Sequence, residues 1–342
     1  ARKISQQTPG GLNRIFFTMC GSSAVETSIK TAIAYFKAKG EGHRSHIVGR
    51  ERGYHGMNIG GISVGGMVAN RKAFSNILMP NVHHLRHTHL KENLFVKGEP
   101  ETGAYLADDL ERIAANIGGE NIAACIVEPI AGSTGSLVPP KGYLKRLREI
   151  CDKHGILLIF DEVITGWGRT GEPFAAQSFD VTPDIITMAK GITNGVMPLG
   201  AVASRESIYD TLLDASPTGA IEFFHGYTYS AIPPCIAAGL AMQEIIKKEN
   251  LFERSKNMSP YFLDGLFSLK DIDIITDIRG YGMLGGIDIK FDERLGKAGF
   301  SCFKKLFEVG LSLKATGDCL IVAPPFICEE HHIDEIIEKL RA

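Results

Sequence analysis

The sequence predicts an α/β fold in two parts: a large domain with a mostly parallel sheet covered by helices, and a smaller C-terminal α+β domain. Short apolar runs that end in a polar residue alternate with longer segments whose apolar residues recur at helical spacing. This alternation is typical of parallel sheets with helices on both faces. The length of 342 residues also favours about two domains. We place the large domain at residues 1–243 and the small domain at residues 244–342.

The first predicted helix covers residues 24–36, where apolar residues recur every three or four positions. Ser23 and Glu26 fit a capping box, so a loop with a glycine and hydroxyl groups leads into this helix N-terminus. The free backbone N–H groups and the dipole of such a terminus can bind a phosphate. The alternative is a capped helix without a ligand.

A glycine-rich, strand-like stretch is predicted next, over residues 46–65. Tyr54 is flanked by glycines there, and an aromatic ring in such a setting can lie flat against a planar ligand. The alternative is an ordinary turn residue. Residues 60–66 are glycine-rich but lack the Gly-Lys-Ser/Thr ending of a P-loop, so we interpret them as backbone that passes near the site.

The later elements follow from the same two patterns, apolar runs for strands and amphipathic runs for helices. Helices are expected at residues 104–117 and 141–154, and strands at 122–127, 155–160, 183–189 and 200–203. A long helical pattern then runs from about residue 230 to 266, and the small domain alternates helices with short strands at 273–275 and 286–289.

Three of the apolar runs lead into ionisable residues, Glu128, Asp161 and Lys190. Because ligands of doubly wound sheets bind at the carboxyl ends of the strands, we expect these side chains to share one site. A lysine in an apolar pocket has a lowered pKa and can act as an amine nucleophile. An aspartate from a neighbouring strand can hold a protonated pyridine nitrogen. Together they suggest pyridoxal 5'-phosphate (PLP).

Each residue of this pair also has an ordinary interpretation. Lys190 can be a surface lysine after a strand, and Asp161 can be a helix-capping aspartate. Taken alone, each residue favours that ordinary interpretation, whereas the combination favours a PLP site.

The composition excludes several other classes of protein. A hydrophobic content of 44% and a charged content of 22% are typical of a globular protein with an ample core. The net charge of −2, with no basic stripe, gives no case for binding nucleic acid. The apolar runs are too short to span a bilayer, and no signal peptide is recognised. Seven cysteines without a Cys-x-x-Cys pair indicate reduced thiols, and hence a cytoplasmic protein.

These motifs, taken together, resemble the class III aminotransferases, a branch of the fold-type-I PLP enzymes. The likeness is greatest to the ω-amino acid:pyruvate transaminases, which include the β-alanine:pyruvate enzymes, and it extends over nearly the whole chain. The motifs that carry it are Gly-Tyr-His-Gly at 53–56, Val-Glu-Pro-Ile-Ala-Gly-Ser at 127–133, Pro-Pro-Lys-Gly-Tyr-Leu at 139–144, Leu-Ile-Phe-Asp-Glu-Val-Ile-Thr-Gly at 158–166, Gly-Arg-Thr-Gly at 168–171, Ala-Lys-Gly at 189–191 and His-Gly-Tyr-Thr-Tyr-Ser at 225–230.

The resemblance implies a role for each residue around the cofactor ring. Lys190 would form the Schiff base, and Asp161 would pair with the pyridinium nitrogen so that the ring can act as an electron sink. Val163 would pack against one ring face and Tyr54 against the other. Glu128 would lie near the ring's phenolic oxygen and the substrate path.

The resemblance also implies how the phosphate is held. Gly21, Ser22 and Ser23 would surround it, and Thr228 would reach the phosphate of a neighbouring subunit. The active unit would therefore be a homodimer with shared active sites, with a tetramer also open. His55, next to the stacking tyrosine, receives no role.

Two departures from the family affect the substrate site. The family has a further N-terminal segment that supplies aromatic residues to the substrate pocket, and we expect it to be absent here. Lys314 and Val322 stand where relatives carry a carboxylate-binding arginine. Lys314 could still meet an acidic group, as a point charge, which leaves room for a sulfonate; alternatively it faces solvent. Trp167 is expected to pack near the lysine loop.

The expected reaction is transamination of a terminal (ω) amine, such as β-alanine, taurine or GABA, with pyruvate as the amino acceptor. The main alternative is an ornithine- or acetylornithine-type enzyme that uses 2-oxoglutarate, and the valine at position 322 argues against it. A PLP aminomutase or decarboxylase and a non-catalytic binding protein are the remaining alternatives. No metal site is expected, although residues 83–89 contain four histidines.

Overall fold

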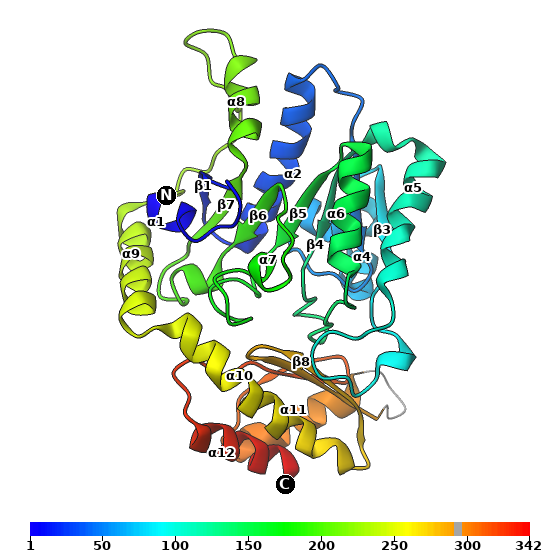
Figure 1. Ribbon diagram of the computed structural model, residues 1–342, viewed down its shortest axis with the longest axis vertical. Coiled ribbons are helices and arrows are strands. Elements are labelled where there is room, and N and C mark those ends of the chain that lie inside the picture. Colours follow the sequence, from blue (N-terminus) through cyan, green and yellow to red (C-terminus); the bar gives the residue numbers. More distant parts are fainter. Residues whose placement is uncertain (291–295) are drawn as a thin grey trace.

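The large domain is built on a mixed, mostly parallel sheet. The computed structural model describes residues 1–290 and 296–342 (Figure 1). Within these residues the sheet has seven strands in the order β1-β7-β6-β5-β4-β2-β3, and β7 alone runs antiparallel to its neighbours. The strands are β1 Arg14–Thr18, β2 His46–Arg50, β3 Val82–Leu85, β4 Ile122–Val127, β5 Leu157–Asp161, β6 Ile185–Met188 and β7 Gly200–Ser204. The predicted α/β architecture is confirmed.

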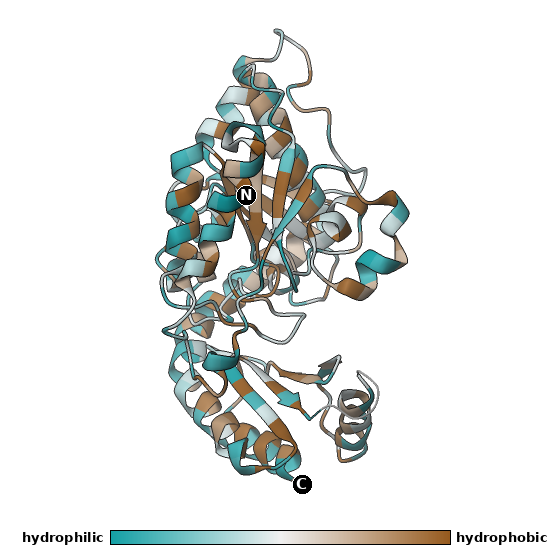
Figure 2. Cartoon of the chain, turned by 90° about the vertical axis from the view of Figure 1, so that its right-hand side faces the viewer, coloured by the Kyte–Doolittle hydropathy of each residue, from teal (hydrophilic) through white to brown (hydrophobic). Residues whose placement is uncertain are grey.

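Helices cover both faces of this sheet because its strands are apolar on both sides. Successive residues of a strand point to opposite faces, and β5 places Leu158 and Phe160 in one core and Leu157 and Ile159 in the other. In Figure 2 the hydrophobic strands lie between more hydrophilic helices. The helices are α1 Arg2–Ser5, α2 Gly21–Ala38, α3 Ile59–Val64, α4 Val68–Ala73, α5 Asp109–Ile117, α6 Tyr143–His154, α7 Ala175–Ser178, α8 Glu206–Asp214 and α9 Pro233–Lys248, with 3₁₀ turns η1 Ser75–Ile77, η2 Lys91–Asn93, η3 Ala104–Asp108, η4 Gly119–Asn121 and η5 Lys190–Ile192.

The C-terminal part forms a second sheet with its own core. Among the described residues this sheet is antiparallel, with four strands in the order β10-β11-β9-β8. Phe262, Leu266 and Ile287 are buried in its core. Its elements are α10 Leu251–Phe267, η6 Ser268–Asp271, β8 Ile275–Tyr281, β9 Leu284–Ile289, α11 Lys297–Glu308, β10 Lys314–Thr316, β11 Cys319–Val322 and α12 Glu330–Arg341.

The division between the two parts lies close to α9. The predicted boundary at residue 243 falls inside this helix, which contributes Cys235 and Ile246 to the core of the large domain. Asn250, with a left-handed φ of 48°, separates α9 from α10. We propose that the chain divides near Asn250, where the direction of the helices changes (Figure 1).

Three sequence expectations differ from the observed elements. The strand-like stretch 46–65 is a strand only to Arg50, and its end forms α3 instead. This helix packs closely on the His55 backbone. A Cβ at Gly61 would lie 2.3 Å from the His55 carbonyl oxygen, so only glycine allows this approach. The long helix expected from residue 230 is broken between α9 and α10, and the strand expected at 273–275 begins at Ile275. No helix of the described residues has the length and apolarity needed to cross a membrane.

Gly49 gives a test of the close packing between β2 and α3. A Cβ at this position would lie 2.0 Å from the Val64 carbonyl oxygen, so Gly49→Ala must displace α3 or the strand. We expect a loss of about 2 kcal/mol or more in the free energy of unfolding, measured by urea denaturation. Gly42→Ala is the control, because a Cβ there meets nothing within 4 Å. Equal stability of the two variants would contradict the packing described here.

Candidate active site

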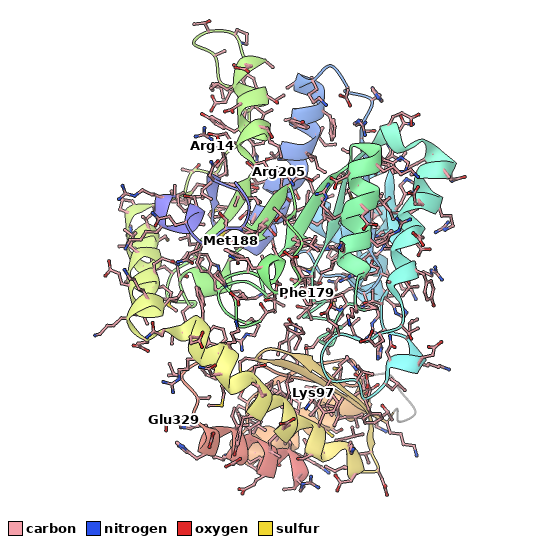
Figure 3. All side chains as sticks on the ribbon, viewed as in Figure 1. Arg14, Lys97, Phe179, Met188, Arg205 and Glu329 are labelled. Carbon is pink, nitrogen blue, oxygen red and sulfur yellow. The ribbon has the colours of Figure 1, made fainter. Side chains whose placement is uncertain are left out.

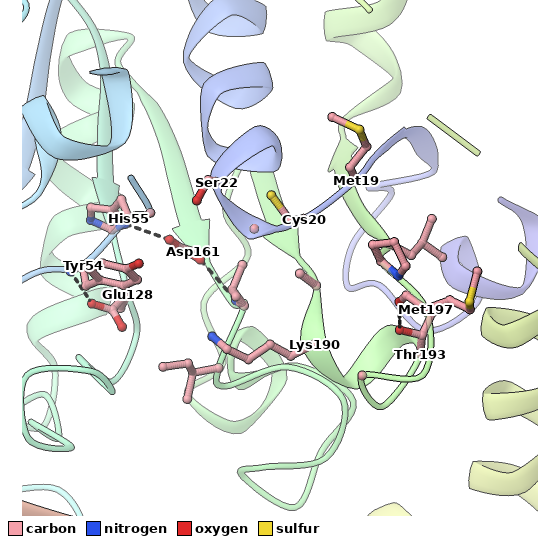
Figure 4. A pocket seen from close by; sticks show the side chains of 18 residues that line it. Met19, Cys20, Ser22, Tyr54, His55, Glu128, Asp161, Lys190, Thr193 and Met197 are labelled. Carbon is pink, nitrogen blue, oxygen red and sulfur yellow. Dashed lines mark hydrogen bonds and ion pairs between the residues drawn. The ribbon is translucent and has the colours of Figure 1, made fainter. Parts of the chain in front are cut away.

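A cavity of about 480 Å³ opens at the carboxyl ends of the parallel strands (Figure 4). It brings together seven of the residues predicted from the sequence, although they come from five separate segments of the chain. These residues are Gly21, Ser22, Tyr54, Glu128, Asp161, Val163 and Lys190. Glu128, Asp161 and Lys190 therefore line one cavity at this edge of the sheet.

Lys190 follows β6 and extends its side chain into the cavity (Figure 4). Its backbone is left-handed, with a φ of 43°. Within the described part of the chain, its Nζ makes no hydrogen bond or ion pair. Solvent in the cavity reaches the side chain, yet partial burial lowers the pKa of Lys190; the charges of Asp161 and Glu128 oppose this shift, and that of Lys314 adds to it. The result is an amine that loses its proton more readily than an ordinary lysine.

Asp161, the last residue of β5, has both carboxylate oxygens fixed by neighbours. Oδ2 lies 2.8 Å from Nδ1 of His55, and Oδ1 accepts hydrogen bonds from the Val163 N–H and the Thr187 hydroxyl, each at 3.1 Å. The His55 side chain is fully buried. A buried carboxylate with these donors keeps one orientation at the edge of the cavity.

His55 is the residue of this site that sequence reasoning missed. It stands 106 residues before Asp161, so no local spacing links the two. The sequence signal for His55 was its place beside Tyr54 in Gly-Tyr-His-Gly. Adjacent residues of such a segment can point in different directions, so that both reach the site.

Glu128 holds the segment that carries Tyr54. Its Oε1 accepts the Tyr54 N–H at 2.8 Å, and its Oε2 accepts the Gly132 N–H at 2.9 Å. Burial raises the pKa of Glu128, an effect that the nearby His55 opposes. The carboxyl group thus ties the loop after β2 to the loop after β4, and Tyr54 becomes part of the cavity wall.

The start of α2 forms another wall, with details that differ from the sequence expectation. The helix begins at Gly21, and the capping box pairs Cys20 with Ser23, not Ser23 with Glu26. Ser23 Oγ accepts the backbone N–H groups of Cys20 and Met19, at 3.0 and 3.2 Å, so Ser23 is buried beneath the cavity and shapes it indirectly. Ser23 turns away from the cavity because it is the N3 residue of the helix, whose side chain reaches back to the backbone of the cap residue.

Gly21 and Ser22 remain at the cavity, where they bring the helix N-terminus close to Val163. A Cβ at Gly21 would lie 3.0 Å from both methyl groups of Val163, so a larger residue would press on this part of the cavity lining. Ser22 Oγ accepts the Met57 N–H at 3.1 Å. The first-turn N–H groups of an 18-residue helix provide a site for an anion such as a phosphate.

Three other predicted residues lie outside the cavity lining. Thr228 is exposed in the loop between α8 and α9. Trp167 is 2% exposed and packs behind the lysine loop, since a Cβ at Gly191 would lie 2.6 Å from the Trp167 Cβ. Lys314 is exposed at the start of β10, where its charge contributes to the lowered pKa of Lys190.

Comparison with known proteins shows that the chain belongs to the class III aminotransferases, because that family's model, Aminotransferase class-III, matches residues 1–342. It is a PLP-dependent aminotransferase with the fold of the fold-type-I PLP enzymes. The resemblance inferred from the sequence motifs is thus confirmed.

Individual relatives support this assignment over most of their length. The chain is 52% identical to the omega-aminotransferase of Caulobacter vibrioides, covering 100% of this chain and 78% of that protein. It is 45% identical to the omega-amino acid–pyruvate aminotransferase of Pseudomonas putida, covering 99% and 76%. The crystal structure of the omega transaminase from Pseudomonas jessenii in complex with PMP has a TM-score of 0.93, with 31% identity over 99% of this chain and 76% of that one.

The hydrogen bond between His55 and Asp161 can be tested by two substitutions. His55→Phe fills the space but leaves Asp161 Oδ2 without its donor. His55→Asn places an amide nitrogen close to the position of Nδ1. An unsatisfied buried group costs about 1–3 kcal/mol, so we expect His55→Phe to lower kcat/KM about 10- to 100-fold. His55→Asn should retain most of it, and equal losses would contradict this role.

The lowered pKa of Lys190 predicts how the cofactor-free protein reacts with aldehydes. A deprotonated amine is the nucleophile, so the rate of PLP capture should rise with pH. The midpoint of this rise should lie below the ordinary lysine pKa of 10.5. Removing the Lys314 charge raises the pKa of Lys190, so Lys314→Met should move the midpoint of this rise to higher pH. The measurement is the capture rate against pH, with the surface variant Lys304→Met as control. An unchanged midpoint in Lys314→Met would refute the electrostatic link between Lys314 and Lys190.

Proposed function

We propose that this aminotransferase transfers the amino group of a terminal (ω) amine, such as β-alanine, taurine or GABA, to pyruvate. The observation that carries the proposal is the Lys190 amine in a cavity shared with Asp161 and the N-terminus of α2. The printed names of relatives at 45–52% identity, an omega-aminotransferase and two aminotransferases for ω-amino acids or β-alanine with pyruvate, support the substrate class.

The residues of the cavity fit PLP. Lys190 would bind it covalently, Asp161 would face the pyridine nitrogen, and Tyr54 and Val163 would enclose the ring. The phosphate would meet the first turn of α2, where glycine at position 21 keeps space beside Val163. Gly56 supports the same cradle, because a Cβ there would lie 2.4 Å from Ser22 Oγ. When bound, PLP supplies an electron sink that makes the carbon bearing the amine acidic.

The chain's own side chains then move and hold protons. Once the substrate amine has replaced it on the cofactor, the Lys190 amine would be free to take the proton from the carbon that bears the substrate nitrogen and to return it to the cofactor carbon, and its lowered pKa suits this exchange. The carboxylate of Asp161 would stabilise positive charge at the ring nitrogen, and His55 would keep that carboxylate in place. Glu128 would hold Tyr54 against the ring through the Tyr54 backbone.

A homodimer with shared active sites is part of the proposal, with a tetramer as the alternative. The loop between α8 and α9, which carries Thr228, exposes the apolar residues Ile221, Phe224 and Tyr229 by 62%, 88% and 67%. Exposed apolar residues that gather in one loop are a common mark of a protein interface. Their position next to Thr228 supports a partner subunit whose phosphate Thr228 would reach.

The acidic end of the substrate would meet Lys314. Val322, where ornithine-type relatives carry an arginine, is only 4% exposed in the core of the small domain. Lys314, in contrast, is exposed and its charge acts on Lys190. An ammonium group is a point charge without the planar fork of arginine, so it can bind either a carboxylate or a sulfonate.

A half-reaction screen tests the function directly. PLP-loaded protein is mixed separately with β-alanine, taurine, GABA, putrescine, ornithine and glutamate, and the visible cofactor band is followed. Loss of the band with β-alanine or taurine, reversed by pyruvate, is the expected result. Loss with ornithine or glutamate, reversed by 2-oxoglutarate, would establish the alternative instead. Lys190→Ala is the control, and its turnover should be abolished.

Lys314→Met tests the recognition of the acidic group. A hydrogen bond to a charged group contributes about 1.5–3 kcal/mol, so the KM for β-alanine or taurine should rise about 10- to 100-fold. Putrescine has no acidic group, and its KM should fall or stay unchanged because a like charge is removed. A uniform change in KM for all three amines would show that Lys314 does not select the substrate.

A further inference from the structure

A segment of the large domain, residues 86–98, extends onto the edge of the small domain. The Phe95 N–H donates to Asp277 Oδ1 at 2.6 Å, and the Gly98 N–H donates to the Gly280 carbonyl at 3.0 Å. Lys97, labelled in Figure 3, forms an exposed ion pair with Asp264 of α10. The segment that follows β3 is therefore attached to β8, the edge strand of the small sheet.

His89 forms a bridge within this segment. Its Nδ1 lies 2.9 Å from Arg52 Nη1, and its Nε2 lies 3.0 Å from Asp277 Oδ2. A guanidinium can only donate, so Nδ1 must accept and Nε2 must carry the proton that it donates to Asp277. The two partners thus fix a neutral histidine in one tautomer, between an arginine of the large domain and an aspartate of the small domain.

On the small-domain side, Arg279 completes the network. It pairs with Asp277 at 2.6 Å and with both oxygens of Asp288 at 2.8 and 2.9 Å, and its Nε donates to the Gly135 carbonyl at 2.7 Å. His89, Asp277 and Asp288 are close enough together to suggest a metal site. Both carboxylates already accept from Arg279, so the group acts as a hydrogen-bond network.

On the large-domain side, the network ends beside the active site. Arg52 Nη2 donates to the Thr134 carbonyl at 3.1 Å, and the Thr134 hydroxyl donates to the Arg52 carbonyl at 2.5 Å. Arg52 has a left-handed φ of 58°, which a residue with a side chain adopts only when its contacts support it. It stands two residues before Tyr54, whose N–H is held by Glu128.

We propose that His89 is a positioning residue for the active site. It links β8 of the small domain to Arg52, and through Arg52 it sets the position of the Tyr54 segment in the cavity wall. The small domain also carries Lys314, so the same contact fixes the proposed acid-binding group relative to the proposed ring-stacking group. The significance for catalysis rests on the proposed function, whereas the mechanical link does not.

Hydrogen exchange of the holoenzyme tests the mechanical link. His89→Leu removes both hydrogen bonds, whereas the amide of His89→Gln can still accept from Arg52 and donate to Asp277. We expect the backbone amides of residues 52–56 to exchange about 10-fold faster in His89→Leu, as for the loss of about 1.4 kcal/mol of local stability. His89→Gln should stay close to the native rate. His83→Leu is the matched control, because His83 pairs with His46 inside the large domain.

Kinetics test the consequence for catalysis. A small displacement of a positioning segment can cost up to about 100-fold in rate, so kcat should fall about 10- to 100-fold in His89→Leu and recover in His89→Gln. KM should change less than kcat. If His89→Leu does not fold, His89→Phe carries the same test, because its ring fills the space of the imidazole and makes neither hydrogen bond.

The outcomes separate this inference from the proposed function. Unchanged exchange at residues 52–56 in His89→Leu, or an equal effect in His89→Gln or His83→Leu, would overturn the positioning role. Faster exchange in His89→Leu alone would support it even if the native enzyme transaminated none of the ω-amines tested. That second result would refute the proposed substrate class and leave the link between the domains standing.

Discussion

The constraint on which the site depends is the placement of two carboxyl groups and one amine at the ends of adjacent strands. β4, β5 and β6 are neighbours in parallel register, so Glu128, Asp161 and Lys190 must meet at one edge. Burial there disfavours every charged form, and opposite charges oppose that effect. Each carboxyl group accepts hydrogen bonds from neighbouring donors, whereas the Lys190 amine has no hydrogen-bond partner among residues 1–290 and 296–342.

The wall of the cavity depends on residues that lack side chains. Gly21, Gly56 and Gly61 each allow an approach that a Cβ would prevent, to Val163, to Ser22 and to the His55 carbonyl. As a result, the N-terminus of α2 and the loop after β2 come within reach of one ligand. The chemistry of the site is therefore set by the strands, while its shape is set by close backbone contacts.

The sequence predicted the parts of the site that local pattern determines. Lys190, Asp161 and Glu128 stand at the ends of apolar runs, and the parallel sheet places such ends together. It could not predict the pairing of His55 with Asp161, the position of Ser23 at N3 of α2 with Cys20 as the cap, or the bridge from His89 to Asp277. Each of these depends on which way a side chain turns and on partners 106 or 188 residues away, or on a helix start shifted by a few positions.

The arginines and lysines discussed above differ in their ability to lose a proton, and they lie in different parts of the molecule. Arginine keeps its charge, and it occupies the junction between the domains: Arg279 joins two aspartates there, and Arg169 donates to the carbonyls of Met283 and Pro324 while it packs on Phe326. Burial lowers the pKa of Arg169 only to about 10, so it remains charged at neutral pH. Lysine shifts its pKa more readily when buried. The amine that we propose to take up and release a proton is accordingly a lysine, Lys190, whereas the permanently charged arginines lie where the two domains meet.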